Sequence, residues 1–279
     1  MSELKSILVH LDAAANAPER LQWAQRLAQG HGARVDVMYA VLPAVLQYPF
    51  AFAGDAQAAA LLTRYEAEQR GRVKALFERE RERLGATMAA NWRETGDEPV
   101  AAFTQCAWAA DLLVLGQYDP DPKAYSGVPA DFVAAVLAAS GKPGLVLPYI
   151  GAGTTLGDTA LIAWKPSAEA ARAVAAALPL LQRAKRVHLA LWNESPQPES
   201  AEPVAIQDYL AHHGVAVTLH RGSAPTGAIG DGLLSLAADV RADLLVMGCY
   251  GHGRAREWVL GGATRTVLNT MTLPVLMTH

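Results

Sequence analysis

The heptapeptide "ADLLVLG" at residues 110–116 returns as "ADLLVMG" at residues 242–248, 132 residues further along a chain of 279. Six of the seven residues are identical. A short apolar run that ends in glycine is typical of a strand buried on both faces of a parallel sheet. Because the chain contains this strand twice, we expect that it contains one folding module twice.

The segments around the repeat follow the same order in both halves. Each half opens with an apolar run, at residues 6–12 and at residues 159–165, and each run leads into a helical pattern. Asn16, with Glu19 three residues on, and Ser167 are the predicted caps of these two helices. The first strand and first helix of the module are therefore predicted in both halves.

Strand and helix alternate through the rest of the chain. Further strands are predicted at 34–41, near 86–93, at 110–116 and at 144–149, and again at 186–192, near 215–221, at 242–248 and at 274–279. This alternation predicts an α/β fold of two tandem open-sheet modules, each a five-stranded parallel sheet with helices on both faces. We place the modules at residues 1–149 and 158–279, joined by a Gly- and Thr-rich linker, and expect their final strands to pair.

The first half is longer by about twenty residues, because the offset between matching strands falls from 152 to 132. We place the surplus in the apolar segment 42–55 and in a long charged helix at 56–85. The charges of that helix are typical of a solvated surface stabilised by ion pairs. The alternative is a helix that binds a partner, since "YPFAF" at 48–52 is strongly apolar.

Composition excludes several classes of function. A net charge of −3 does not favour nucleic-acid binding, and no uncharged apolar run is long enough to cross a membrane. Two cysteines are too few for a disulfide framework, and the first residues lack the pattern of a signal peptide. We therefore expect a cytoplasmic protein that binds neither nucleic acid nor membranes.

The two repeated strands differ in the loop that follows them. After Gly248 the chain reads "CYGHGRAREWVLGGAT", which is rich in glycine and arginine. Glycines let backbone N–H groups approach phosphate oxygens, and a helix that starts near Gly262 adds unpaired N–H groups. The sequence therefore predicts a phosphate-binding loop, with a tight turn that binds no ligand as the alternative.

The repeated strands, the spacing of Gly248, Gly251 and Gly261, and the Pro-Val-Leu at 274–276 resemble the universal stress proteins over nearly the whole chain. The resemblance implies two modules of the adenine nucleotide alpha hydrolase-like fold that pair with each other within the chain, and members are often dimers. It also implies a stress-response protein that binds ATP or AMP. The site residues that we infer are Lys165, Trp192, Gly248, Gly251, Gly253, Arg254, Gly261, Gly262 and Ala263.

This chain departs from the family pattern at two of these positions. Gly262 stands where the family has serine or threonine, so a hydroxyl contact to phosphate is absent. Lys165 stands where the family often has an aspartate beside the ribose, and an ammonium group accepts no hydrogen bond. Lys165 therefore either contacts a phosphate or points into solvent. Mg²⁺ is an optional companion of the nucleotide, although no acidic residue is clearly placed to hold it.

The first half shows the opposite departure. Asp12 keeps the family aspartate, but "QYDPDPKAYSGVPAD" follows Gly116, with prolines that donate no N–H and acids that repel phosphate. We expect this module to have lost its phosphate site and Asp12 to cap a helix or act at a hinge.

These observations predict a regulatory protein that binds an adenine nucleotide in its C-terminal module. Two alternatives remain. One is a dimerisation or interaction protein that binds no nucleotide, and the other is a slow ATPase. The sequence contains no convincing pair of nucleophile and base.

Overall fold

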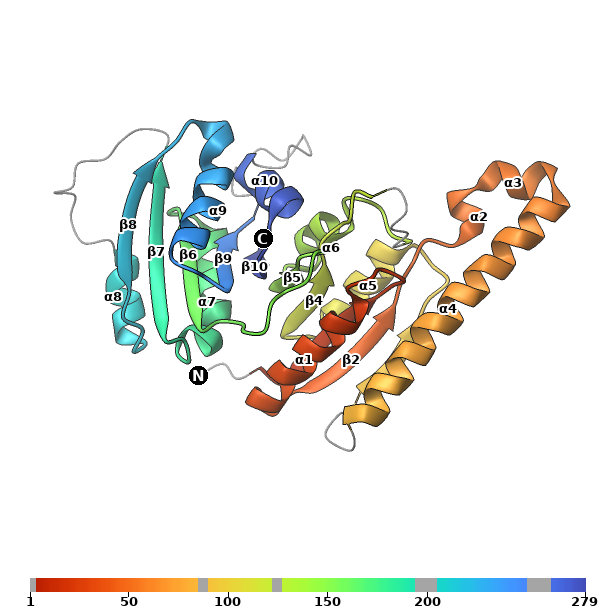
Figure 1. Cartoon of the computed structure of the whole chain (residues 1–279), viewed down its shortest axis with the longest axis horizontal. Helices are drawn as coiled ribbons and strands as arrows, with labels where there is room; N and C mark the ends of the chain where they lie inside the picture. Colours follow the sequence, from red (N-terminus) through yellow and green to blue (C-terminus); the bar gives the residue numbers. More distant parts are fainter. Residues whose placement is uncertain (1–3, 85–89, 122–126, 194–204, 250–261) are drawn as a thin grey trace. The chain divides into compact units, whose positions relative to one another are not determined.

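The computed structural model describes residues 4–84, 90–121, 127–193, 205–249 and 262–279 (Figure 1). Its internal contacts divide these residues into two compact units, residues 4–142 and residues 143–279. Each unit is an α/β layer structure, as the alternation of strand and helix predicts. Within the described ranges, no helix combines the length and the apolar character that crossing a membrane requires.

The first unit contains four parallel strands in the order β3-β2-β1-β4. They are β1 (Ser6–Leu11), β2 (Arg34–Tyr39), β3 (Ala90–Glu94) and β4 (Leu112–Gly116). Helix α1 (Ala17–His31) packs on β1, β2 and β4 and against the long helix α4 (Ala56–Leu84). Helices α5 (Pro99–Ala107) and α6 (Phe132–Ser140) pack together, with α5 on β1.

The second unit contains five parallel strands in the order β10-β9-β6-β7-β8. They are β6 (Thr159–Trp164), β7 (Arg186–Asn193), β8 (Thr218–Ser223), β9 (Leu244–Gly248) and β10 (Val275–Thr278). The helices are α7 (Ala168–Leu181), α8 (Ala205–His212), α9 (Ile229–Asp239) and α10 (Gly262–Thr270). Helix α7 packs on β6, β9 and β10, while α9 packs on β7 and against α10.

Strand β5 (Gly144–Leu147) is the fifth strand predicted for the first module, but it lies in the second compact unit, where it pairs antiparallel with β10. Val146 lies opposite Val275, and Leu145 lies opposite Leu276. The expected pairing of the two final strands is therefore confirmed. Leu145, Val146 and Leu147 are fully buried, and β5 covers the backbone edge of β10.

The first helix of each unit buries the same positions, 153 residues apart. Both helices bury residues at the i, i+3, i+4, i+7 spacing of an amphipathic helix. The matching buried positions are Ala17, Arg20, Leu21, Ala24, Leu27 and Ala28 in α1, and Ala170, Ala173, Val174, Ala177, Leu180 and Leu181 in α7; α1 buries Trp23 and Gln25 in addition. The duplication therefore extends to the packing of these helices, and it makes Ala173 the counterpart of Arg20.

One of the two predicted caps is confirmed and the other is wrong. The hydroxyl of Ser167 accepts a hydrogen bond from the backbone N–H of Ala170 at 3.2 Å. Asn16 precedes α1, but its side chain makes no cap hydrogen bond, and Glu19 therefore completes no capping box. The cause is backbone geometry, because Asn16 lies at φ −86° and ψ 5° and not in the extended region that an N-cap side chain needs.

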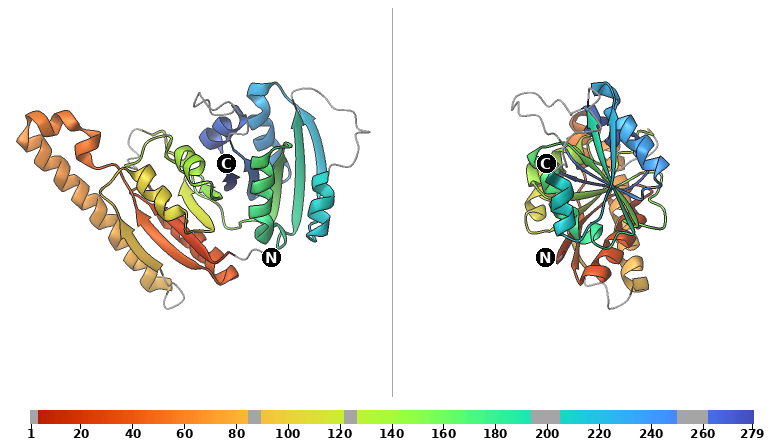
Figure 2. Two further views of the ribbon diagram at one scale, coloured as in Figure 1. Left: turned by 180° about the vertical axis from the view of Figure 1, so that it is seen from behind. Right: turned by 90° about the vertical axis from the view of Figure 1, so that its left-hand side faces the viewer.

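The surplus residues of the first half form α2 (Ala44–Gln47), α3 (Pro49–Gly54) and the 29 residues of α4. Figure 1 and the left view of Figure 2 show α2 and α3 at the amino-terminal end of α4. The second unit has the eight residues of α8 at the corresponding point of the chain. The predicted location of the insertion agrees with these elements.

A prediction follows from the pairing of β5 with β10. A fragment of residues 143–279 should unfold with a free energy about 3 kcal/mol or more above that of a fragment of residues 150–279, because the shorter fragment loses the buried side chains of β5. Urea denaturation of the two fragments, followed by circular dichroism, measures this difference.

A third fragment, residues 158–279, controls for the linker and should behave like residues 150–279. Equal stability of all three fragments would contradict a structural role of β5 in the second unit.

Candidate functional site

The carboxyl ends of the parallel strands form the candidate site of the second unit. Lys165 follows β6, Trp192 lies near the end of β7, and Gly248 ends β9. In a parallel sheet these ends lie along one edge, where ligands of open α/β folds bind. The described part of the predicted site therefore gathers at one edge of one sheet.

Gly248 is required by packing as well as by any ligand. A Cβ atom added at Gly248 would lie 2.5 Å from the backbone nitrogen of Ala170 and 2.7 Å from the backbone carbon of Glu169. The amino-terminal turn of α7 therefore packs directly on the end of β9. The glycine sets the distance between this helix and the strand, which a larger residue would increase.

The ring of Trp192 is packed inside the second unit. A Cβ atom added at Gly222 of β8 would lie 2.6 Å from the ring, and one added at Gly232 of α9 would lie 2.7 Å from the indole nitrogen. The two glycines thus make room for the tryptophan between β8 and α9. The ring is half-buried and supports the end of β7, and the backbone there is the predicted contact for a base.

Lys165 is exposed, and it follows β6 directly. Gly262, Ala263 and Thr264 form the first turn of α10. This turn is fixed against α9, because a Cβ at Gly230 would lie 2.6 Å from Thr266 and 3.1 Å from the carbonyl oxygen of Ala263. Gly251, Gly253, Arg254 and Gly261 lie outside the described residues.

Two buried polar atoms beside Gly248 were missed in the sequence. The indole Nε1 of Trp164, on β6, and the Oγ1 of Thr278, on β10, have no hydrogen-bond partner in the part of the chain that the structure describes. Both strands flank β9, and Thr278 lies opposite Gly248 in the ladder. Buried polar groups without a partner are rare and require an explanation, such as a ligand or a bound water.

Cys249 follows Gly248 and is fully buried. Burial raises the pKa of its thiol to about 12. A thiol with this pKa stays protonated at neutral pH and is a poor nucleophile. The structure therefore agrees with a small packing residue at this position. Among the described side chains, no group of three or more His, Cys, Asp or Glu residues is placed to hold a metal ion.

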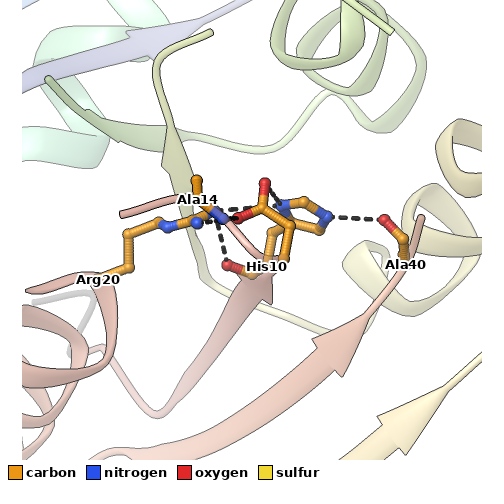
Figure 3. A network of polar contacts seen from close by, with 5 residues as sticks. His10, Ala14, Arg20 and Ala40 are labelled. Carbon is orange, nitrogen blue, oxygen red and sulfur yellow. Dashed lines mark hydrogen bonds and ion pairs between the residues drawn. The ribbon is translucent and has the colours of Figure 1, made fainter. Parts of the chain in front are cut away.

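The matching edge of the first unit holds a buried charge network (Figure 3). The guanidinium of Arg20 pairs with the carboxylate of Asp12, and its Nη1 donates to the backbone oxygen of His10 at 3.1 Å. The Nε2 of His10 lies 2.8 Å from the backbone oxygen of Ala40, and the Nδ1 of His10 lies 3.3 Å from the Nη1 of Arg20. Since a carbonyl oxygen only accepts, Nε2 carries the proton and Nδ1 accepts from Arg20.

The protonation states follow from this arrangement. Burial lowers the pKa of His10 to about 4; the charge of Asp12 works against this change and the charge of Arg20 adds to it. Burial alone would raise the pKa of Asp12, but the charge of Arg20, assisted by His10 and by hydrogen bonds, holds that pKa below its ordinary value. At neutral pH the network is thus a neutral imidazole beside a charged pair.

Arg20 also fills the space beside Gly116, the glycine that matches Gly248. A Cβ atom added at Gly116 would lie 3.0–3.2 Å from three atoms of the Arg20 guanidinium group. The second unit has no such arrangement, because Lys165 and Ala173 stand 153 residues after Asp12 and Arg20. One edge therefore holds an internal ion pair, and the other holds an exposed cation and an alanine.

The role of Arg20 was missed in the sequence, although a signal was present. The expected role of Asp12 as a cap or hinge was incomplete: its Oδ1 does accept from the N–H of Ala14, but its main partner is Arg20. Arg20 occupies an apolar position of the stripe that α1 buries. An arginine in such a stripe needs an acidic partner, and Asp12 lies only eight residues earlier.

This network predicts an acid-sensitive stability. The unfolded chain binds a proton at His10 with an ordinary pKa of 6.5, whereas the folded protein binds it with a pKa of about 4. The free energy of unfolding should therefore be fully retained above about pH 6.5 and should fall toward pH 4 by up to about 3 kcal/mol. Urea denaturation at a series of pH values measures this slope.

The variant His10→Gln isolates the contribution of His10. Its amide can donate to Ala40 and accept from Arg20 without titrating, so its slope between pH 6.5 and pH 4 should be flatter than that of the wild type. The comparison cancels other groups, including His188, whose pKa burial also lowers. Parallel curves for the two proteins would show that His10 does not cause the loss.

Comparisons with known proteins agree with the duplicated fold. The sequence model of the universal stress protein family matches residues 3–119 and residues 161–279. A universal stress protein from Archaeoglobus fulgidus DSM 4304 has a similar structure, with a TM-score of 0.71, 17% identity and coverage of 98% of this chain and 95% of that chain. A search of curated protein sequences gave no match.

Two further solved structures are similar to this chain, with lower TM-scores. A functionally unknown protein from Pseudomonas aeruginosa PAO1 has a TM-score of 0.58 and 16% identity, and covers 99% of this chain and 92% of that chain. A universal stress protein in complex with cAMP covers 53% of this chain and 99% of that chain, with 21% identity and a TM-score of 0.32. At these identities the solved structures establish the fold alone.

Proposed function

Because the chain belongs to the universal stress protein family, we propose that its second module, residues 158–279, binds an adenine nucleotide, ATP or AMP, in a regulatory role. One observation carries the proposal. The buried pair of Asp12 and Arg20 in the first unit is replaced in the second by Lys165, which is exposed, and Ala173. The second edge therefore lacks the internal guanidinium that fills the first.

The electrostatics of this edge favour an anion. Helices α7 and α10 begin where the parallel strands end, so their amino ends add partial positive charge to that of Lys165. Glu169 is the opposing charge, and it pairs with Arg172 at 3.4 Å. The polar atoms of Trp164 and Thr278 that have no partner among the described residues lie on the strands beside Gly248. A phosphate group fits this combination of positive ends and unused polar groups.

The contacts that we propose follow the family pattern. Backbone groups around the phosphates would come from Gly248, Gly251, Gly253, Gly261, Gly262 and Ala263, with Arg254 as a cationic donor. The backbone near Trp192 would contact the adenine. Lys165 would contact a phosphate, because an ammonium cannot accept a hydrogen bond from the ribose. Any Mg²⁺ would arrive with the phosphates of ATP, since the described residues offer no acidic cluster.

Calorimetry on the nucleotide-stripped protein tests this proposal. We expect one ATP site per chain, weakened about tenfold in Lys165→Ala, which is the loss expected for one hydrogen bond to a charged group. Gly262→Ser should strengthen binding by a similar factor, because it restores the hydroxyl that the family uses. AMP should depend less on Lys165, since it carries fewer phosphates.

The matched control is Lys185→Ala. Lys185 is also exposed, but it precedes β7 and pairs with Asp158 at 2.8 Å, at the amino end of the strands. The Lys185→Ala substitution removes the same charge as Lys165→Ala and should leave the affinity for ATP unchanged. Failure of ATP, ADP and AMP to bind the wild type would refute the proposal. If both lysine variants lost the same amount of ATP affinity, the effect of Lys165 would come from the net charge of the protein and not from a contact with phosphate.

A second candidate function, a docking surface for another protein or a second copy of the chain, is favoured by exposed apolar side chains on the first unit. The side chain of Phe50 on α3 is 91% exposed. Other large apolar side chains are exposed on the neighbouring segments, namely Val45, Leu46, Tyr48, Leu61 and Tyr65. Clusters of this kind are typical of protein interaction sites.

Light scattering coupled to gel filtration tests the homodimer form of this function. If two copies associate through this surface, Leu46→Ser with Phe50→Ser should convert dimer to monomer without changing the melting temperature. Trp108→Ser, which removes an exposed ring from the end of α5, is the control. A wild type that is monomeric at high micromolar concentration would exclude the homodimer.

A further inference from the structure

Two histidines face each other on neighbouring strands of the second unit. In the register of β7 and β8, His188 pairs with Thr218 and Ala190 pairs with His220. His188 and Ala190 are two residues apart on one strand, so His188 and His220 project from the same face of the sheet. The Nδ1 of His188 lies 2.9 Å from the Nε2 of His220, and the ring centroids are 5.1 Å apart.

We propose that His188 and His220 form a two-imidazole site for a divalent late transition-metal ion. The metal would take the Nδ1 of His188 and the Nε2 of His220 as adjacent ligands, with water in its other positions. Nothing in this proposal depends on nucleotide binding. His188 lies four residues before Trp192, about 13 Å away along β7, so the two sites are separate.

The distance between the two nitrogens supports a particular geometry. Imidazole nitrogens bind such metals at about 2.0–2.1 Å. Two ligands at that distance and at a right angle lie about 2.9 Å apart, whereas tetrahedral ligands lie about 3.4 Å apart. The observed separation is 2.9 Å. The pair therefore matches the right-angle geometry that Cu²⁺ and Ni²⁺ adopt better than the tetrahedral geometry of Zn²⁺.

The site is open to solvent on one side. Both histidines are half-buried, and β8 is the last strand in the order of the second unit. Water can therefore reach the pair and complete the coordination. Because the described residues place no third His, Cys, Asp or Glu ligand there, the site would hold its metal less tightly than a structural site of three or four side chains.

Arg186, the cation on the same strand as His188, is held away from the pair. Arg186 donates to the Oγ1 of Thr159 at 3.1 Å, which directs its guanidinium toward β6. In the metal-free pair, one ring donates its proton to the other. Binding would move that proton to the outer nitrogen of the same ring through solvent, with no net release.

Isothermal titration calorimetry, in which Ni²⁺ or Cu²⁺ is added to the EDTA-treated full chain, tests the proposal. We expect one site per chain for each metal, with Zn²⁺ weaker. His188→Gln and His220→Gln should each weaken Ni²⁺ binding at least tenfold. The control is His212→Gln, on the exposed face of α8, which should bind like the wild type. Melting curves without metal verify that every variant is folded.

A spectroscopic measurement on the unmutated protein makes the test independent of the variants. With one equivalent of Cu²⁺, the electron paramagnetic resonance spectrum should show splitting from two imidazole nitrogens, and either glutamine variant should remove it. The proposal is overturned if both variants bind Ni²⁺ within twofold of the wild type. It is also overturned if the Cu²⁺ spectrum shows no imidazole nitrogen or does not change in the variants.

Discussion

The parallel arrangement of the strands is the constraint on which the rest of the molecule depends. Each parallel strand requires a crossover, and here helices supply the crossovers, so the carboxyl ends of the strands and the amino ends of the helices meet at one edge. This edge concentrates unpaired N–H groups and partial positive charge. A side chain or ligand that carries negative charge is favoured there, and the two halves of the chain differ in the side chains that they place at this edge.

In the first unit the sequence itself supplies the negative charge. Asp12 directly follows β1, and Arg20 balances it from α1 while filling the space beside Gly116. The carboxylate and the guanidinium neutralise each other in a buried place, although the Nε of Arg20 has no hydrogen-bond partner among the described residues. In the second unit neither partner is present, and Lys165 adds to the positive charge of the helix ends. The modules thus differ at two equivalent positions, where a buried ion pair in the first is replaced by an exposed lysine and a buried alanine in the second.

Much of the fold could be predicted because its signals are local. The duplicated strand, the alternation of strand and helix, and the surplus in the first half are all patterns along the chain, and the structure confirms them. The pairing of β5 with β10 followed from the need to cover a sheet edge. The missed features depend on geometry. The backbone of Asn16 does not let its side chain cap α1. The residues around Arg20 come from β1, from the loop after it and from β4, which only folding brings together. The phosphate loop stays a prediction, because residues 250–261 lie outside the described ranges.

The ion pair of the first unit explains why the two positions must change together. Removing one member of a buried pair leaves an uncompensated charge and costs about 3–5 kcal/mol, whereas replacing both members by other residues is often neutral. A module with Asp12 but without Arg20, or the reverse, would be strongly destabilised. Ala173 is fully buried where Arg20 stands, and Lys165 is exposed where Asp12 is buried, so the second module avoids this penalty. Its edge is therefore built without an internal ion pair.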